Sequence, residues 1–335
     1  LSIIKQSYGF GYETIEGLKK SLKRDLKSFN ERLDYNLNID FDGRSIVNDD
    51  PNDIRDKAYG DNNVRPKEGR SHGTHVSGII AAKRNNGIGI NGAADNVKIM
   101  AIRNTPNGDE YDKDVALGVY YAVNNGAKVI NMSFGKGFSD HSNWVKGAIA
   151  YAAKYDVLIV AAAGNNGENN DFVKNYPNDQ DGIGEEVSDN FISVGASTSD
   201  YSSDLIAGFS NYGKKEVDVF APGVKIYSTI PGGNTYQFLQ GTSMASPIVA
   251  GVAALLLEYF PTLSALQLKE IIEQSFTPVV DSIRTPGTGA LTTLNNISRA
   301  GGVLNAHEAV RLTSTIKGER KISAGNKNDS SPLQK

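Results

Sequence analysis

The fold class is decided by the run Val157-Leu158-Ile159-Val160-Ala161-Ala162-Ala163. This run carries no charge and ends at Gly164-Asn165, and the residues before it, 144–155, have helical spacing. An apolar run of this length is typical of a strand that is buried on both faces. A buried strand that follows a helix indicates a parallel sheet with helices packed on its two sides.

The same alternation of apolar runs and helical patterns extends in both directions from this strand. Further strands are expected at 97–102, 128–134, 191–196 and 217–220, and helices at 114–125, 144–155 and 243–260. Asp114 would cap the first of these helices, and Gly126 would follow its last turn. The helix at 243–260 is apolar almost all round and should lie at the centre. We therefore predict an α/β fold with three α/β/α layers and a mostly parallel central sheet.

Composition excludes several classes of protein. The chain has 335 residues, of which 39% are hydrophobic and 22% charged, as in ordinary globular proteins. A net charge of −3 gives no sign of nucleic-acid binding. The longest apolar run, 248–257, is about half the length of a membrane span. Cysteine is absent, which excludes disulfides and thiolate metal sites. With no sign of another partner, a monomer is the default expectation.

The chain is predicted to have three parts. Residues 1–35 form an amphipathic helical N-terminal extension or insert, with the helix at 13–33. Its polar face is rich in lysine, which suits either a membrane or partner surface, or a solvated face on a helix that packs against the main domain. Residues 36–312 form the main domain. Residues 313–335 are polar and are expected to be a disordered tail. The predicted apolar stripe of the helix consists of Ile15, Leu18, Leu22, Leu26, Phe29 and Leu33.

A candidate general base lies in the segment Ser71-His72-Gly73-Thr74-His75. The segment opens a helix, so His72 stands at a helix start, from which its ring can project into a cleft. A serine hydroxyl needs such a base within hydrogen-bond reach to become a nucleophile. His75, nearly one turn further on, also allows a metal pair, but no third ligand is near in the sequence.

The candidate nucleophile is Ser243, in Gly241-Thr242-Ser243-Met244-Ala245-Ser246-Pro247. It lies at the start of the central helix, where backbone N–H groups are unpaired and the helix dipole favours negative charge. The alternative is that Ser243 is only an N-cap. We place Pro247 in the first turn, where a missing N–H costs nothing.

Asn165 is the candidate oxyanion donor. It follows the buried strand after Gly164, and its side-chain amide can donate a hydrogen bond to a developing oxyanion alongside the backbone N–H of Ser243. The alternative is that Asn165 merely favours a turn.

Together and in this order, these motifs resemble those of the subtilisin-like serine peptidases, the subtilases, over roughly residues 40–312. The resemblance implies a serine endopeptidase that acts on peptides or proteins by acyl transfer and is secreted or periplasmic. It implies that His72 is catalytic and His75 structural. It also implies that an extended substrate pairs with a strand edge and borders the region Ala162–Gly164. The substrate-binding residues that it implies are Ser133, Phe134, Gly135, Ala163 and Gly164.

The chain departs from the family in its triad acid. Subtilases carry an aspartate at the end of the first core strand, and no such strand is evident before His72. We expect the aspartate to lie upstream of Leu1. Two alternatives stay open. Asp40 or Asp42 could be the acid, or the chain could be an inactive subtilase-like fragment or pseudoenzyme that acts as a peptide-binding module.

A calcium site is a further candidate. The loop Asn85-Asn86-Gly87-Ile88-Gly89-Ile90 resembles one that binds calcium in several subtilases, with Asn86 as a ligand. Calcium takes six or more oxygens, and the loop offers few side-chain oxygens. A tight glycine turn without metal is therefore the favoured interpretation, and no cofactor is required for the expected chemistry.

Overall fold

A computed structural model describes residues 15–65, 70–105, 110–181, 185–279 and 282–320. The chain forms two compact units, one of residues 1–62 with 103–111 and the other of residues 63–102 with 112–335. This division falls at other places than residues 35 and 312, where the sequence predicts boundaries.

The first unit contains helix α2 (Ile15–Glu31), the π-helical turn η1 (Arg32–Asn36) and the 3-10 turn η2 (Arg44–Ile46). The predicted N-terminal helix is thereby confirmed. Arg44 joins the two sequence segments of this unit. Its Nε donates to Asp49 at 2.6 Å, and its guanidinium lies over the ring of Tyr111, 4.4 Å from the ring centroid.

The second unit is built on a six-stranded sheet in the order β1-β2-β3-β4-β10-β7. All neighbours in this sheet run parallel except β10 and β7. The strands β2 and β3 are buried along their whole length, as a strand covered on both faces requires. The strands are β1 (Val129–Met132), β2 (Leu158–Ala162), β3 (Phe191–Ser197), β4 (Val219–Pro222), β7 (Phe276–Thr277) and β10 (Val303–Leu304).

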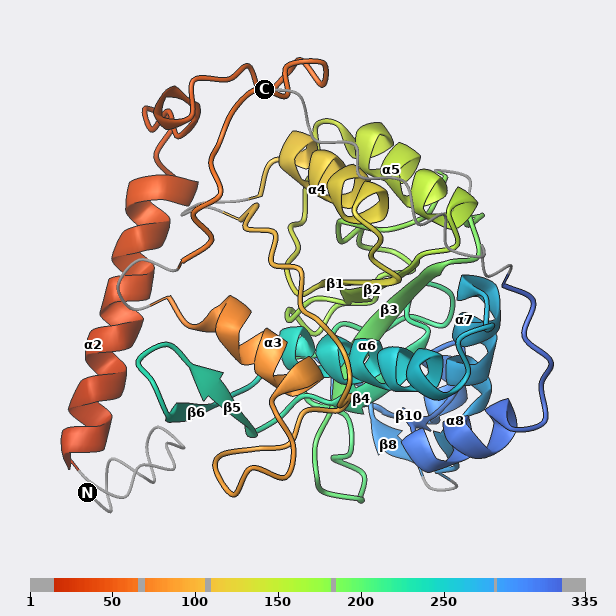
Figure 1. Cartoon of the computed structure of the whole chain (residues 1–335). Helices are drawn as coiled ribbons and strands as arrows, with labels where there is room; N and C mark the ends of the chain where they lie inside the picture. The colour runs from red at the N-terminus through yellow and green to blue at the C-terminus, as the bar shows by residue number, and fades with distance from the viewer. Residues whose placement is uncertain (1–14, 66–69, 106–109, 182–184, 280–281, 321–335) are drawn as a thin grey trace. The chain divides into compact units, whose positions relative to one another are not determined.

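Helices cover both faces of this sheet, which confirms the predicted three-layer α/β/α fold (Figure 1). Helices α4 (Asp112–Asn124) and α5 (Ser142–Lys154) pack together on one face. Helix α6 (Thr242–Tyr259) crosses the other face and contacts strands β1 to β4. Helix α6 is long and apolar enough to cross a membrane, but 61% of it is buried inside the protein, as expected of a core helix.

The remaining elements flank this core. Helices α3 (His72–Ala81), α7 (Ala265–Gln274) and α8 (Ala306–Thr313) contact α6. Two hairpins complete the unit. They are formed by β5 (Ile226–Ile230) with β6 (Thr235–Leu239), and by β8 (Ile283–Arg284) with β9 (Leu291–Thr292). The 3-10 turn η3 spans Leu294–Asn296.

Two predictions about local structure are wrong. Residues 97–102 form no strand, and Ile99 and Met100 are 44% and 40% exposed. A parallel strand needs a neighbour with which to pair, and this segment pairs with no described strand. Helix α4 begins at Asp112, so Asp114 lies in its first turn and is not its cap. The Asp112 carboxylate accepts instead from the backbone N–H of His141, at 2.8 Å.

The prediction of a disordered tail from residue 313 is wrong for residues 313–320, and residues 321–335 lie outside the described ones. Ile316 packs against the main core. The carbonyl of Lys317 accepts from Gln267 at 2.9 Å, and Arg320 pairs with Asp156 at 3.0 Å. One apolar side chain and a few polar contacts hold this segment, although its composition is that of a tail.

Candidate active site

Helices α3 and α6 carry the two main candidate residues and pack against each other. Val76 and Ile79 of α3 form a buried cluster with Met244 of α6. Met244 follows Ser243 directly, so this packing brings the start of α6 against the helix that His72 begins. Figure 1 shows α3 beside α6. The structure thus brings together two motifs that lie far apart in the sequence.

The His72 ring is open to solvent, but the surrounding protein still affects its protonation. Desolvation lowers the pKa of His72 below its ordinary value, and positive charge on the nearby His75 lowers it further. Both effects keep the ring neutral, the form in which a histidine accepts a proton. Among the described residues, no hydrogen bond joins His72 to Ser243. The Ser243 hydroxyl donates to the Ser133 carbonyl instead, at 3.2 Å.

His75 has a structural role in the second unit. It is fully buried, and its Nε2 lies 3.1 Å from the carbonyl of Ile226 and 3.0 Å from that of Gln237. Because carbonyls only accept, Nε2 carries the proton and donates to both. His75 therefore fastens α3 to the β5–β6 hairpin and is not available through this nitrogen as a metal ligand.

Asn165 lies against the start of α6. Its Oδ1 accepts from the backbone N–H of Thr242 at 2.8 Å and from the Thr242 hydroxyl at 3.1 Å. Because Oδ1 accepts these bonds, Nδ2 is available as a donor. Among the described residues, neither Asn165 Nδ2 nor the backbone N–H of Ser243 has a hydrogen-bond partner. Asn165 thus caps the helix with one atom and presents a free N–H with the other.

Gly241 leaves the space between these two donors open. A Cβ atom at Gly241 would lie 3.4 Å from Asn165 Oδ1, 3.6 Å from its Nδ2 and 3.7 Å from the backbone nitrogen of Ser243. Its φ of 142° is one that glycine adopts readily and other residues rarely do. Stabilisation of an oxyanion requires unpaired donors of this kind.

The predicted substrate-binding segments meet around a residue that the sequence did not indicate. A Cβ at Gly135 would lie 3.2 Å from the side chain of Asn175, and one at Gly164 would also lie 3.2 Å from it. Lys136 pairs with Tyr176 as an antiparallel bridge. Nothing in the local sequence around Asn175 signals that it lies between these segments, because its position depends on a contact with Gly135, which is 40 residues away in the sequence. Phe134 is half-buried.

Ala163 differs from the other predicted substrate-binding residues. It is only 1% exposed, and it belongs to a core cluster that includes Val217 and Phe220. Its carbonyl accepts from the Asn170 side chain at 2.9 Å. The Ala163 side chain therefore packs in the core beneath the predicted substrate-binding segment and does not reach the surface.

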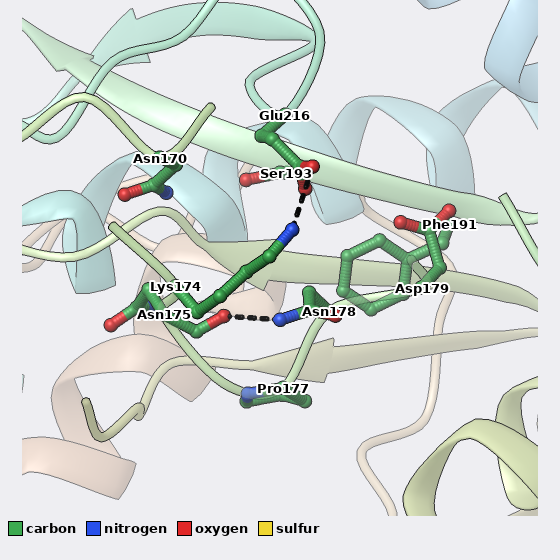
Figure 2. A pocket seen from close by; sticks show the side chains of 9 residues that line it. All are labelled: Asn170, Lys174, Asn175, Pro177, Asn178, Asp179, Phe191, Ser193 and Glu216. Atoms are coloured by element: carbon green, nitrogen blue, oxygen red, sulfur yellow. Dashed lines mark hydrogen bonds and ion pairs between the residues drawn. The ribbon is translucent and has the colours of Figure 1, made fainter. Parts of the chain in front are cut away.

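Asn175 also lines a polar pocket (Figure 2). Lys174 reaches Glu216 across it, with 3.5 Å between Nζ and Oε1. Burial, together with negative charge on nearby acids, raises the pKa of Asp179 to about 7. The pocket is lined by Asn170, Lys174, Asn175, Pro177, Asn178, Asp179, Phe191, Ser193 and Glu216.

The candidate calcium loop uses its side-chain oxygens internally. The Asn86 Oδ1 accepts from the backbone N–H of Ile88 at 3.1 Å, and Asn91 Oδ1 accepts from that of Asn85 at 3.0 Å. Over the described ranges, no group of three His, Cys, Asp or Glu residues is placed to hold a metal ion. These contacts support a glycine turn, and calcium binding stays a prediction.

Comparisons with known proteins identify the family of the chain. The sequence profile of the subtilase family matches residues 17–301. The chain is 39% identical over 272 residues to a thermophilic serine proteinase of Bacillus sp. (strain AK1), covering 81% of this chain but 59% of that protein. It is 41% identical over 252 residues to thermitase of Thermoactinomyces vulgaris, covering 75% and 78% of the two chains. A solved protease of Pseudoalteromonas arctica superposes with a TM-score of 0.59 at 28% identity, over 76% of this chain and 75% of the other.

Proposed function

Since the chain belongs to the subtilase family, we propose that it is a serine endopeptidase that hydrolyses peptide bonds by acyl transfer. The observation that carries this proposal is the pair of unpaired donors, Asn165 Nδ2 and the Ser243 N–H, beside the bare Cα of Gly241. Such a pair suits the negative oxygen of a tetrahedral intermediate. The proposed substrate is an extended peptide or protein segment that pairs with the edge at 133–135.

In the proposed reaction, Ser243 Oγ attacks the scissile carbonyl while His72 takes the hydroxyl proton. The oxygen of the intermediate accepts hydrogen bonds from Asn165 and from the Ser243 N–H. His72 then gives its proton to the leaving amine as the C–N bond breaks. Water attacks the acyl-enzyme with His72 again as base, which releases the acid and restores Ser243. The hydroxyl must first turn from the Ser133 carbonyl to His72.

We propose that a strand paired with the outer edge of β1 supplies the triad aspartate. Three observations support this proposal. β1 is partly exposed, and among the described strands it pairs only with β2. The apolar segment 97–102 has no strand partner in the described chain. Asn131 Oδ1 on β1 is buried without a hydrogen-bond donor among the described residues, and buried acceptors normally have one. Asp40 and Asp42 remain the alternative acids.

A secreted or periplasmic location is proposed from the family resemblance. An inactive, peptide-binding role is the alternative function, and one observation favours it. The Ser243 hydroxyl donates to Ser133 and not to His72, which is the geometry of a nucleophile without an engaged base.

Labelling with a fluorophosphonate tests the proposal. We expect covalent modification of Ser243, found by peptide mass spectrometry, and its loss in Ser243→Ala. In His72→Ala the labelling rate should fall by about 100-fold or more, as loss of a general base does. The variants Asp40→Asn and Asp42→Asn should label at the rate of the parent chain. A parent chain that is not labelled, or is labelled equally fast without His72, would contradict the endopeptidase proposal and favour the binding module.

A further inference from the structure

The carbonyl of Ser243 lacks its usual partner within its own helix, the N–H four residues later. In an α-helix, the carbonyl of a residue accepts from the N–H of the residue four positions later. That residue is Pro247, which lies inside α6 and has no N–H. The prediction that Pro247 falls in the first turn is therefore wrong. Because α6 begins at Thr242, Pro247 is its sixth residue, and the missing N–H is one that the helix would have used.

Ser133 supplies the missing donor from outside the helix. It follows the last residue of β1, and its hydroxyl donates to the Ser243 carbonyl at 2.9 Å. The same hydroxyl lies 2.9 Å from the Ser246 hydroxyl and 2.9 Å from Asn131 Nδ2. A hydroxyl has one hydrogen and two lone pairs. The hydrogen of the Ser133 hydroxyl points to the Ser243 carbonyl. Ser246 and Asn131 must therefore both donate to the Ser133 oxygen, and the hydroxyl makes all the hydrogen bonds that it can.

The bond between Ser133 and Ser243 is partly buried and lies beside fully buried groups. Ser246 is completely buried, and Pro247 beside it is buried as well. A hydroxyl that makes all its hydrogen bonds to protein groups is held in one orientation. The Ser133 backbone carbonyl, in turn, accepts from the hydroxyl of Ser243. Ser133 thus contacts both the backbone and the side chain of Ser243.

We infer that Ser133 is a positioning residue for the nucleophile, which replaces the N–H that Pro247 lacks and so fixes Ser243 at the end of β1. Asn131 and Ser246 orient the Ser133 hydroxyl for this bond. The inference rests on the proposed function, since it concerns the placement of the proposed nucleophile. It assigns to the Ser133 side chain a role that is separate from substrate pairing through its backbone.

A compensating pair of substitutions tests this inference. Ser133→Ala leaves the Ser243 carbonyl without a donor, and the second-order rate of fluorophosphonate labelling should fall about tenfold, the effect of one hydrogen bond. Pro247→Ala provides an N–H at the required position within the helix. In the Pro247→Ala background, Ser133→Ala should therefore lower the rate by no more than about twofold. The pH midpoint of labelling should not move, because His72 is untouched.

The matched control is Ser298→Ala. Ser298 is also completely buried, and it accepts from the N–H of Gly301 at 3.1 Å, but it belongs to a different part of the second unit. We expect its labelling rate to be unchanged. If Ser133→Ala cannot be folded, Ser246→Ala replaces it, with a smaller loss expected because the Ser133 hydroxyl is then less firmly oriented. An equal loss with and without Pro247, or no loss at all, would overturn the inference.

Amide hydrogen exchange separates this inference from the proposed function. Ser133→Ala should speed exchange in residues 241–247, and Pro247→Ala should reverse that change. If the parent chain is not labelled at all, the endopeptidase proposal fails, and the exchange rates alone decide. Unchanged exchange in Ser133→Ala would then show that its hydroxyl does not anchor α6.

Discussion

The pH dependence of folding stability tests a partly buried ion cluster that includes Asp218, next to β4. Lys269 Nζ lies 2.7 Å from Glu186 and 3.9 Å from Asp218, and Arg299 Nε lies 3.1 Å from Asp218. More acids than cations meet here, so some of the acids are held neutral. The acids are Asp179, Glu186, Asp218 and Glu273, and the cations are Lys269 and Arg299.

Two of these acids have raised pKa values in the folded protein. Burial, and after it the negative charge of Asp218, raises the pKa of Glu273 from 4.5 to about 8. Burial and the same neighbour raise the pKa of Asp179 from 3.8 to about 7. For each acid, the relevant pH interval runs from its ordinary pKa to its raised pKa in the folded protein. Within that interval the folded state binds more protons than the unfolded state, so the free energy of unfolding falls as pH rises. Each acid lowers the free energy of unfolding by at most about 1.4 kcal/mol per pH unit in its interval.

Glu273→Gln isolates one of these contributions, because glutamine resembles the protonated acid. The free energy of unfolding of the variant should equal that of the parent chain near pH 5. Between pH 5 and 8, the decrease per pH unit should be about 1 kcal/mol smaller in the variant than in the parent chain. Glu270→Gln, on the exposed side of the same helix, is the matched control. Urea unfolding at pH 5, 6, 7 and 8, followed by far-ultraviolet circular dichroism in a Ser243→Ala background, measures this difference without self-digestion.

Two results would refute this reasoning. The first is a parent chain whose free energy of unfolding is constant or rises between pH 5 and 8. The second is a pH slope for Glu273→Gln that is no shallower than that of Glu270→Gln. Either would show that the cations Lys269 and Arg299 keep all the nearby acids ionised in the folded protein.

Three further predictions concern the site itself. Asn165→Ala should lower turnover by roughly 100- to 1000-fold, the range measured for such a donor in subtilisin, and an unchanged turnover number would exclude the oxyanion role. As the pH is lowered, the rate of Ser243 labelling should fall to half at a pH below 6.5, because desolvation and His75 lower the pKa of His72. A midpoint well above pH 6.5 would indicate a carboxylate against the His72 ring. Gly135→Ala should raise KM for peptide substrates by about tenfold or more, with kcat less affected, because its Cβ would come within 2.9 Å of the Tyr176 carbonyl.

Much of the fold follows from local patterns in the sequence. The strand at 157–163 was predicted from its apolar run, because a strand between two helical layers needs no polar residue on either face. The central helix was predicted from an apolar surface all round. The motifs that contain His72, Asn165 and Ser243 were recognised from their order and their resemblance to the subtilases, and they supply the base, the donor and the hydroxyl that the expected chemistry requires.

Tertiary structure decided the features that depend on distant partners. The apolar segment 97–102 is no strand, because pairing requires a neighbour that local sequence does not specify. The role of Asn175 depends on contacts with Gly135 and Gly164. Pro247 removes a helix donor that Ser133 replaces from the end of β1, 110 residues away from Ser243 in sequence. A sequence shows which groups need partners, and only packing shows which partners reach them, because hydrogen bonds and burial act over a few ångströms regardless of separation along the chain.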